Sequence, residues 1–147
     1  MARQYDRIKE LAKTADARGR TGPVIMHTKD LEPGRDGTAG DSALISEPEV
    51  LGSLVQTMAM ALNVIPPKQA TGRHRHNSEH LLYVLQGHGR TEVEGSIYEW
   101  GEGDVIATPM RAWHQHFNDD PEIPVRYIGI NNTPLLRAMS LIGREDG

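Results

Sequence analysis

The sequence predicts a single all-β domain, a sandwich or barrel of short strands, and three observations lead to that prediction. From residue 43 onward, apolar runs of about five to nine residues alternate with turn signals. Fifteen glycines and nine prolines are spread along the chain, which suits strands joined by turns better than a helical bundle. The length of 147 residues fits one domain that can bury a core of its own.

The first part of the chain has a different residue pattern from the rest. Residues 4–17 show a weak helical pattern that a Gly-Pro pair ends, and a short strand is expected at 23–27. Residues 28–42 are polar and glycine-rich, with no apolar period, and predict a loop. We therefore divide the chain into an N-terminal helix and loop extension, 1–42, and a barrel domain, 43–147.

The barrel domain is expected to consist of strands in close succession, each bounded by a turn signal such as Pro66-Pro67, Glu94-Gly95 or Gly101-Glu102-Gly103. The predicted strands are 43–45, 52–65, 72–76, 80–86, 89–93, 96–100, 104–108, 114–118 and 125–131. The strand at 80–86 is expected to pair antiparallel with the strand at 72–76, across the short turn between them. A short helix over 135–142 is expected to cap one side. The sequence has no internal repeat that would indicate a second domain.

Composition excludes several classes of function. The chain has no cysteine, which rules out disulfides, thiolate metal sites and cysteine nucleophiles. The formal net charge is −4 and no basic run is present, so nucleic-acid binding is disfavoured. No stretch approaches the roughly 18 apolar residues of a membrane span, and the polar N-terminus does not resemble a signal peptide. We expect a soluble, cytoplasmic protein with no membrane or nucleic-acid partner.

Histidines form the main chemical signal. Six of the seven lie between His74 and His116. His74 and His76 are two residues apart, and on a strand such residues point to the same face. Because neutral imidazole is the commonest metal ligand in proteins, both rings could reach one ion inside a barrel. His114 and His116 repeat this spacing on a later predicted strand.

Two segments carry a family resemblance. Residues 72–87, GRHRHNSEHLLYVLQG, look like the first cupin motif, and residues 103–118, GDVIATPMRAWHQHFN, look like the second. The two motifs occur in the expected order and span about 47 residues, counted directly along the sequence. The resemblance implies a double-stranded β-helix, or jelly-roll barrel, that binds one divalent metal ion.

The chain departs from the family pattern at the acidic ligand. Counting from the H-x-H pair and from Gly87 places His80 at that position, with Glu79 one residue earlier. A one-residue bulge would turn Glu79 inward instead, so Glu79 stays an alternative. The ligands that the resemblance implies are His74, His76, His80 and His114. Four imidazoles would leave the ion its full +2 charge, which favours anionic, chelating substrates.

The same segments are similar to the gentisate 1,2-dioxygenase branch of the superfamily. That similarity implies an Fe(II) dioxygenase acting on a small aromatic or chelating carboxylate, with Mn, Ni, Zn or Cu as alternative metals. His116 is the candidate catalytic residue, as a proton shuttle or ligand-orienting group. A non-redox lyase, isomerase or decarboxylase using Zn, Ni or Mn, and a non-catalytic small-molecule-binding cupin, are the alternatives.

Other candidates have simpler interpretations. Arg111 and Arg126 could pair with a substrate carboxylate, although a solvated surface position is the simpler interpretation. His88 lies in a predicted turn and is expected to be solvated. Single-domain cupins commonly pair and open sandwiches have edge strands to cover, so we expect a homodimer, with residues 24–26 as a candidate strand for a partner's sheet.

Overall fold

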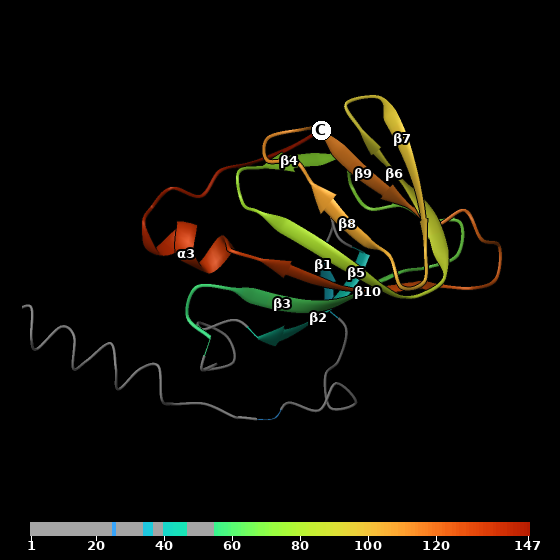
Figure 1. Cartoon of the computed structure of the whole chain (residues 1–147), viewed down its shortest axis with the longest axis horizontal. Coiled ribbons are helices and arrows are strands. Elements are labelled where there is room, and N and C mark those ends of the chain that lie inside the picture. Colours follow the sequence, from blue (N-terminus) through green and yellow to red (C-terminus); the bar gives the residue numbers. More distant parts are fainter. Residues whose placement is uncertain (1–24, 26–33, 37–39, 47–54) are drawn as a thin grey trace, which may run out of the picture.

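The computed structural model of the 147-residue chain describes residue 25, residues 34–36 and 40–46, and residues 55–147 (Figure 1). The all-β prediction is confirmed, since the described chain forms two antiparallel sheets with one short helix. The predicted helix at 4–17 lies outside the described residues. So does most of the predicted strand at 23–27, of which Ile25 alone is described and is not in a strand.

The first sheet has six strands in the order β1-β2-β3-β10-β5-β8. Their bounds are β1 Gly34–Asp36, β2 Gly40–Ser46, β3 Ala59–Ile65, β10 Val125–Asn131, β5 His80–Gln86 and β8 Val105–Thr108. Two of these bounds, those of β5 and β10, match the prediction to the residue. The expected loop at 28–42 is wrong in part, because β1 and the start of β2 lie within it and β2 continues the sheet beyond β3.

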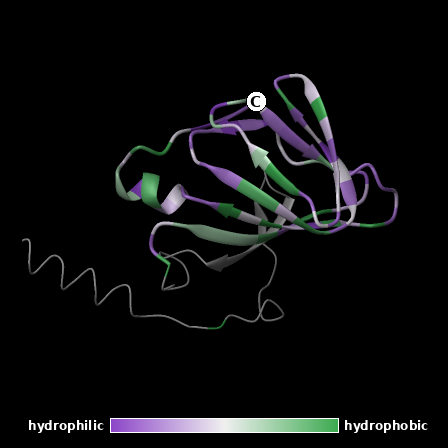
Figure 2. Ribbon diagram, viewed as in Figure 1, coloured by the Kyte–Doolittle hydropathy of each residue, from purple (hydrophilic) through white to green (hydrophobic). Residues whose placement is uncertain are grey.

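The second sheet has five strands in the order β11-β4-β9-β6-β7. Their bounds are β11 Arg144–Asp146, β4 His74–His76, β9 His114–Phe117, β6 His88–Val93 and β7 Ser96–Gly101. The helix, α3 (Thr133–Ala138), starts with a proline in its first turn and is shorter than predicted. The chain then returns as β11 to pair with β4, which was not predicted. Figure 2 shows β9 as a hydrophilic strand and β5 with hydrophobic stretches.

The interior has an apolar part and a polar part. The apolar cluster consists of Ile65, Leu82, Val84, Trp100, Val125 and Tyr127. The buried polar residues are Asn63, Thr71, His74, His76, Ser78, Thr91, Thr108, His114, His116 and Asn118. Leu82 and Tyr127 belong to the apolar cluster and also line a cavity with the histidines. The apolar cluster therefore supports one wall of a polar cavity.

The alternation along β5 fixes which residues face that cavity. Leu82 and Val84 are buried, whereas Leu81, Tyr83 and Leu85 are exposed. This is the register expected if His80 begins the inward set, because a shift of one residue would reverse every side chain.

Asn118, the last residue of the second motif, has a structural role: its Nδ2 donates to the carbonyl oxygens of Ile65 and Ile123 at 2.9 and 3.0 Å.

Gly89 in β6 lies very close to residues of β9 and β7, its two neighbouring strands in the second sheet. A Cβ placed there would lie 2.2 Å from the Phe117 carbonyl oxygen and 2.6 Å from the Trp100 ring. We expect Gly89→Ala to lower the free energy of unfolding by about 3 kcal/mol, the upper end for overpacking, because backbone must move. Gly101→Ala is the matched control, since a Cβ there meets only His88, at 4.0 Å. Chemical denaturation compares the two, and equal losses would contradict the prediction.

Within the part of the chain that the structure describes, no helix has the length and apolar character needed to cross a membrane.

Candidate metal centre

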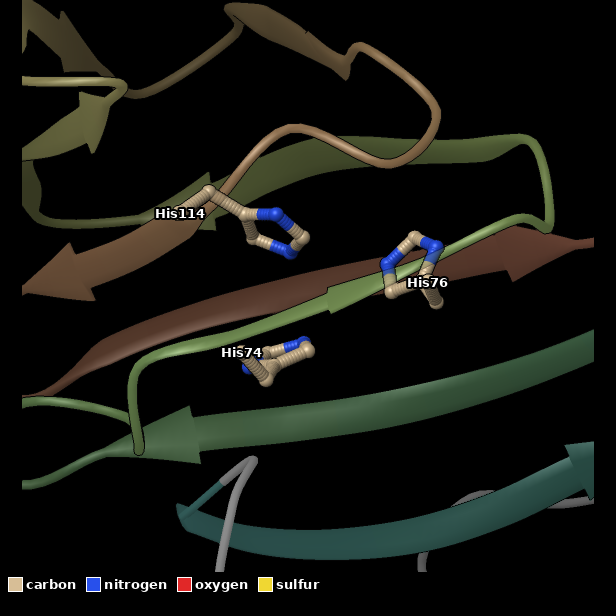
Figure 3. A group of neighbouring side chains, drawn as sticks. All are labelled: His74, His76 and His114. Carbon is tan, nitrogen blue, oxygen red and sulfur yellow. The ribbon is translucent and has the colours of Figure 1, made fainter. Parts of the chain in front are cut away.

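Strand pairing brings three histidines together. β4 pairs with β9 so that His74 lies opposite His114, and His76 follows on the same face of β4. The ring centroids of His74 and His114 are 4.4 Å apart, and those of His76 and His114 are 4.9 Å apart. One ring nitrogen from each of the three lies within 4.8 Å of the others. Figure 3 shows the three rings directed toward a common space.

Each of the three rings is held by its Nδ1 atom. In every case Nδ1–H donates to a backbone carbonyl oxygen two residues away along the chain. The acceptors are Gly72 for His74, Ser78 for His76 and Ala112 for His114, at 2.8, 2.9 and 2.9 Å. A hydrogen bond of this kind fixes the tautomer, so the Nε2 lone pair is available to a metal ion.

The surroundings keep these rings neutral. Burial is the main cause that lowers the pKa of His74 and His76 below 6.5, and it lowers the pKa of His114 to about 4. Neighbouring imidazoles lower the pKa of His76 and His114 further, because two cations cannot share the site cheaply. Neutral imidazole is the form that binds a metal, so protons compete little with a metal ion near pH 7.

Two of the Nε2 atoms need a partner. Among the described residues, the buried Nε2 atoms of His76 and His114 have no hydrogen-bond partner. An unpaired buried polar atom lowers the stability of the fold by about 1–3 kcal/mol. An unpaired nitrogen of this kind indicates that an ion or a water molecule binds there. Three fixed, neutral imidazoles with their free nitrogens gathered in one place are the donor set of a divalent transition metal. The residues present therefore fit a metal ion.

His80 approaches the cluster from the opposite sheet. Its ring centroid is 5.4 Å from that of His76, and it lines the same cavity, of about 330 Å³. Burial lowers its pKa to about 3, with His76 and His114 as further causes. Its ring nitrogens are not among those gathered within 4.8 Å.

The predicted pairing of 72–76 with 80–86 is wrong, because the segment between them crosses from one sheet to the other, and β5 pairs with β10 and β8 instead.

Glu79 faces away from the cluster. Its side chain is exposed, and its Oε2 accepts a hydrogen bond from Asn132 Nδ2 at 2.9 Å. Its backbone N–H also donates to Asn132 Oδ1 at 3.0 Å. Among the described residues, β5 shows no bulge before Leu82 that would turn Glu79 inward, since His80 lies directly opposite Thr108 and Asn131.

His116 lies deeper in the same cavity. Its ring centroid is 5.7 Å from that of His114, and burial holds its pKa well below 6.5. The Thr91 hydroxyl lies 2.8 Å from His116 Nδ1, and Trp100 Nε1–H donates to the same hydroxyl oxygen at 2.8 Å. Because Trp100 supplies a donor to that oxygen, the hydroxyl proton is free to go to Nδ1. This arrangement favours a His116 tautomer with its proton on Nε2.

Sequence reasoning did not identify Thr91, Trp100 or Arg144 as parts of this region. Thr91 and Trp100 are ordinary strand residues in sequence, and their link to His116 depends on the pairing of β6 with β7 and β9. Arg144 lies in a three-residue strand near the end of the chain, where no apolar alternation signals a strand. His88, predicted to be solvated, is exposed.

Comparisons with known proteins agree with this geometry. The model of the cupin domain family matches residues 61–131. The chain is 33% identical over 90 residues to 5-aminosalicylate 1,2-dioxygenase of Comamonas sp, covering 61% of this chain and 24% of that protein. It is 30% identical over 118 residues to gentisate 1,2-dioxygenase of Streptomyces sp, covering 78% of this chain and 32% of that protein.

A solved structure supports the fold. Salicylate 1,2-dioxygenase from Pseudoaminobacter salicylatoxidans, with gentisate adducts, superposes with a TM-score of 0.68 at 24% identity, covering 81% of this chain and 33% of that chain. The chain spans about a quarter to a third of the length of these three proteins. The two motifs, the strand order and the family match all point the same way: residues 61–131 form a cupin domain, and the described chain has the cupin fold.

Proposed function

We propose that this protein binds Fe(II) through His74, His76 and His114, with His80 as the fourth ligand, and acts as a dioxygenase on a small aromatic carboxylate. The observation that carries the proposal is the set of three neutral imidazoles with fixed Nδ1 protons and converging free nitrogens. The names of the dioxygenases that this chain resembles support the reaction class. When bound, a ferrous ion would supply a site for dioxygen and for a chelating substrate.

The chain's own residues would orient the substrate and exclude water. Leu82 and Tyr127 form an apolar wall against which an aromatic ring can pack. We propose His116 as the catalytic residue: its Nε2–H would donate a hydrogen bond to a substrate or oxygen atom, while Thr91 and Trp100 hold the ring in place. His80, half-buried and neutral, faces the same cavity from β5, which supports its assignment as the fourth ligand.

Oxygen consumption tests the proposal directly. The protein is reconstituted with Fe(II) under anaerobic conditions and mixed with air-saturated buffer and gentisate, salicylate or 5-aminosalicylate. We expect one O₂ to be consumed per substrate, because both oxygen atoms enter the ring-opened product. Turnover that continues without O₂, supported by Zn, Ni or Mn, would favour a lyase, isomerase or decarboxylase instead. Tight binding of these compounds without any turnover would favour a small-molecule-binding cupin.

A homodimer stays a prediction. The outer face of the six-stranded sheet carries exposed apolar side chains, among them Leu81, Tyr83 and Val105, at 48, 45 and 62% exposure, and an apolar patch of this kind is typical of an interface. We expect a dimer by sedimentation at micromolar concentration, and a monomer for Tyr83→Lys. A monomeric wild type would contradict the prediction.

The cytoplasm is our proposed location, which cell fractionation would test.

A further inference from the structure

The C-terminal strand β11 adds one charged residue, Arg144, to the wall of the histidine cavity. β11 pairs antiparallel with β4, so that Arg144 lies opposite His76 and Asp146 lies opposite His74. Residues that face each other across an antiparallel pair project to the same side of the sheet. Since His74 and His76 point into the cavity, Arg144 and Asp146 start from the same face. Glu145, between them, projects to the other side and pairs with Arg75.

Arg144 lines the cavity, and its positive charge acts on the histidines there. It is one of the lining residues, together with His76 and Leu82. Its positive charge also contributes to the low pKa values of the four clustered histidines His74, His76, His80 and His114. Its Nε–H donates to Asp146 Oδ1 at 3.1 Å. Asp146 thus engages the Nε edge of the guanidinium group, and the two Nη atoms at the other edge are not committed to it.

This arrangement suits a carboxylate ligand. The guanidinium fork matches the two oxygens of a carboxylate, and such pairs are among the strongest polar contacts in proteins. The four imidazoles of the cluster are neutral, so they offer no charge to balance a bound metal or to repel an anion. Arg111 and Arg126, the arginines that the sequence suggested for this role, are exposed, and among the described residues neither lines the cavity.

We propose that Arg144 binds the carboxylate of the aromatic substrate, with Asp146 as a positioning residue that orients the guanidinium group. The inference rests on the proposed function and names a binding residue for that same site. A substrate held in this way would keep its ring hydroxyl toward the histidines and its ring against Leu82 and Tyr127. The selectivity that Arg144 confers is for a carboxylate over an uncharged substituent at the same ring position.

Ligand binding without turnover tests this inference. Zinc-loaded protein is titrated by calorimetry with salicylate, which has a carboxylate, and with catechol, which does not. We expect Arg144→Gln to weaken salicylate binding about 10- to 100-fold, the scale of a lost charge-assisted contact, and to change catechol binding less than about threefold. Arg144→Lys keeps the charge without the fork and should restore part of the affinity. Asp146→Asn should give a smaller loss, again for salicylate alone.

Arg75→Gln is the matched control, because Arg75 lies on β4 but pairs with Glu145 on the opposite side of the sheet. It should leave both affinities unchanged. Equal salicylate binding by wild type and Arg144→Gln would overturn the inference while leaving the proposed function intact, and so would an equal loss for both ligands. A wild-type protein that binds neither salicylate nor gentisate would overturn the proposed function, and the inference with it.

Discussion

Replacing His76 or His114 by alanine should abolish stoichiometric metal binding. Each ring contributes a buried Nε2 that, within the described chain, has no other partner, and each is fixed by a carbonyl oxygen. Loss of a residue that merely supports a ligand weakens metal binding about 10- to 100-fold, so loss of a ligand itself should cost more than about 100-fold. Elemental analysis and competitive titration of purified protein against a chelator measure the effect.

The control for these variants is His88→Ala. His88 is exposed at the start of β6, with its Nδ1 3.9 Å from an Asp120 carboxylate oxygen, and it should bind metal like the wild type when replaced. A second measurement separates ligand loss from misfolding. Metal that binds only the folded state raises the melting temperature, so wild type and His88→Ala should show the rise and a folded His76→Ala should not. Full metal content in His76→Ala would contradict the assignment.

Local patterns predicted the fold where a short-range rule applies. The alternation over 80–86 and 125–131 gave the bounds of β5 and β10, because period-two burial is set within each strand. The H-x-H spacing likewise predicted that His74 and His76 share an inward face, which is buried. His114 and His116 follow the same rule on β9.

Partners across the sheets could not be predicted in the same way. The turn after His76 suggested a hairpin between β4 and β5, but the chain crosses to the other sheet there. This crossing depends on the long-range pairing of β5 with β10 and β8. β11 has three residues, all exposed, so neither burial nor alternation marked it. Arg144 was therefore not identified as a cavity residue from the sequence, whereas Arg111 and Arg126 are exposed, as their simpler interpretation predicted.

Replacing His80 by alanine should weaken metal binding far more than replacing Glu79. His80 is half-buried and lines the cavity, and a Cβ at Gly129 would lie 3.0 Å from its Nε2, so β10 leaves room for this ring. Glu79 is exposed and its carboxylate accepts a hydrogen bond from Asn132. We expect a loss of at least about 10- to 100-fold in metal affinity for His80→Ala and a change within about twofold for Glu79→Ala, whose energetic effect is that of one exposed hydrogen bond.

Gly129→Ala provides an independent variant that keeps every imidazole. The added methyl group would crowd His80 Nε2 and also Asn63 Nδ2, at 3.0 and 3.1 Å, and should displace the His80 ring. If His80 is a ligand, Gly129→Ala lowers metal affinity in the same direction as His80→Ala, whereas Glu79→Ala does not. Competitive titration with a fluorescent chelator measures all three proteins, each checked for its fold by circular dichroism. Loss of the metal in Glu79→Ala, together with its retention in His80→Ala, would instead identify the site as one with three histidines and one glutamate, and hence with an ion of lower net charge.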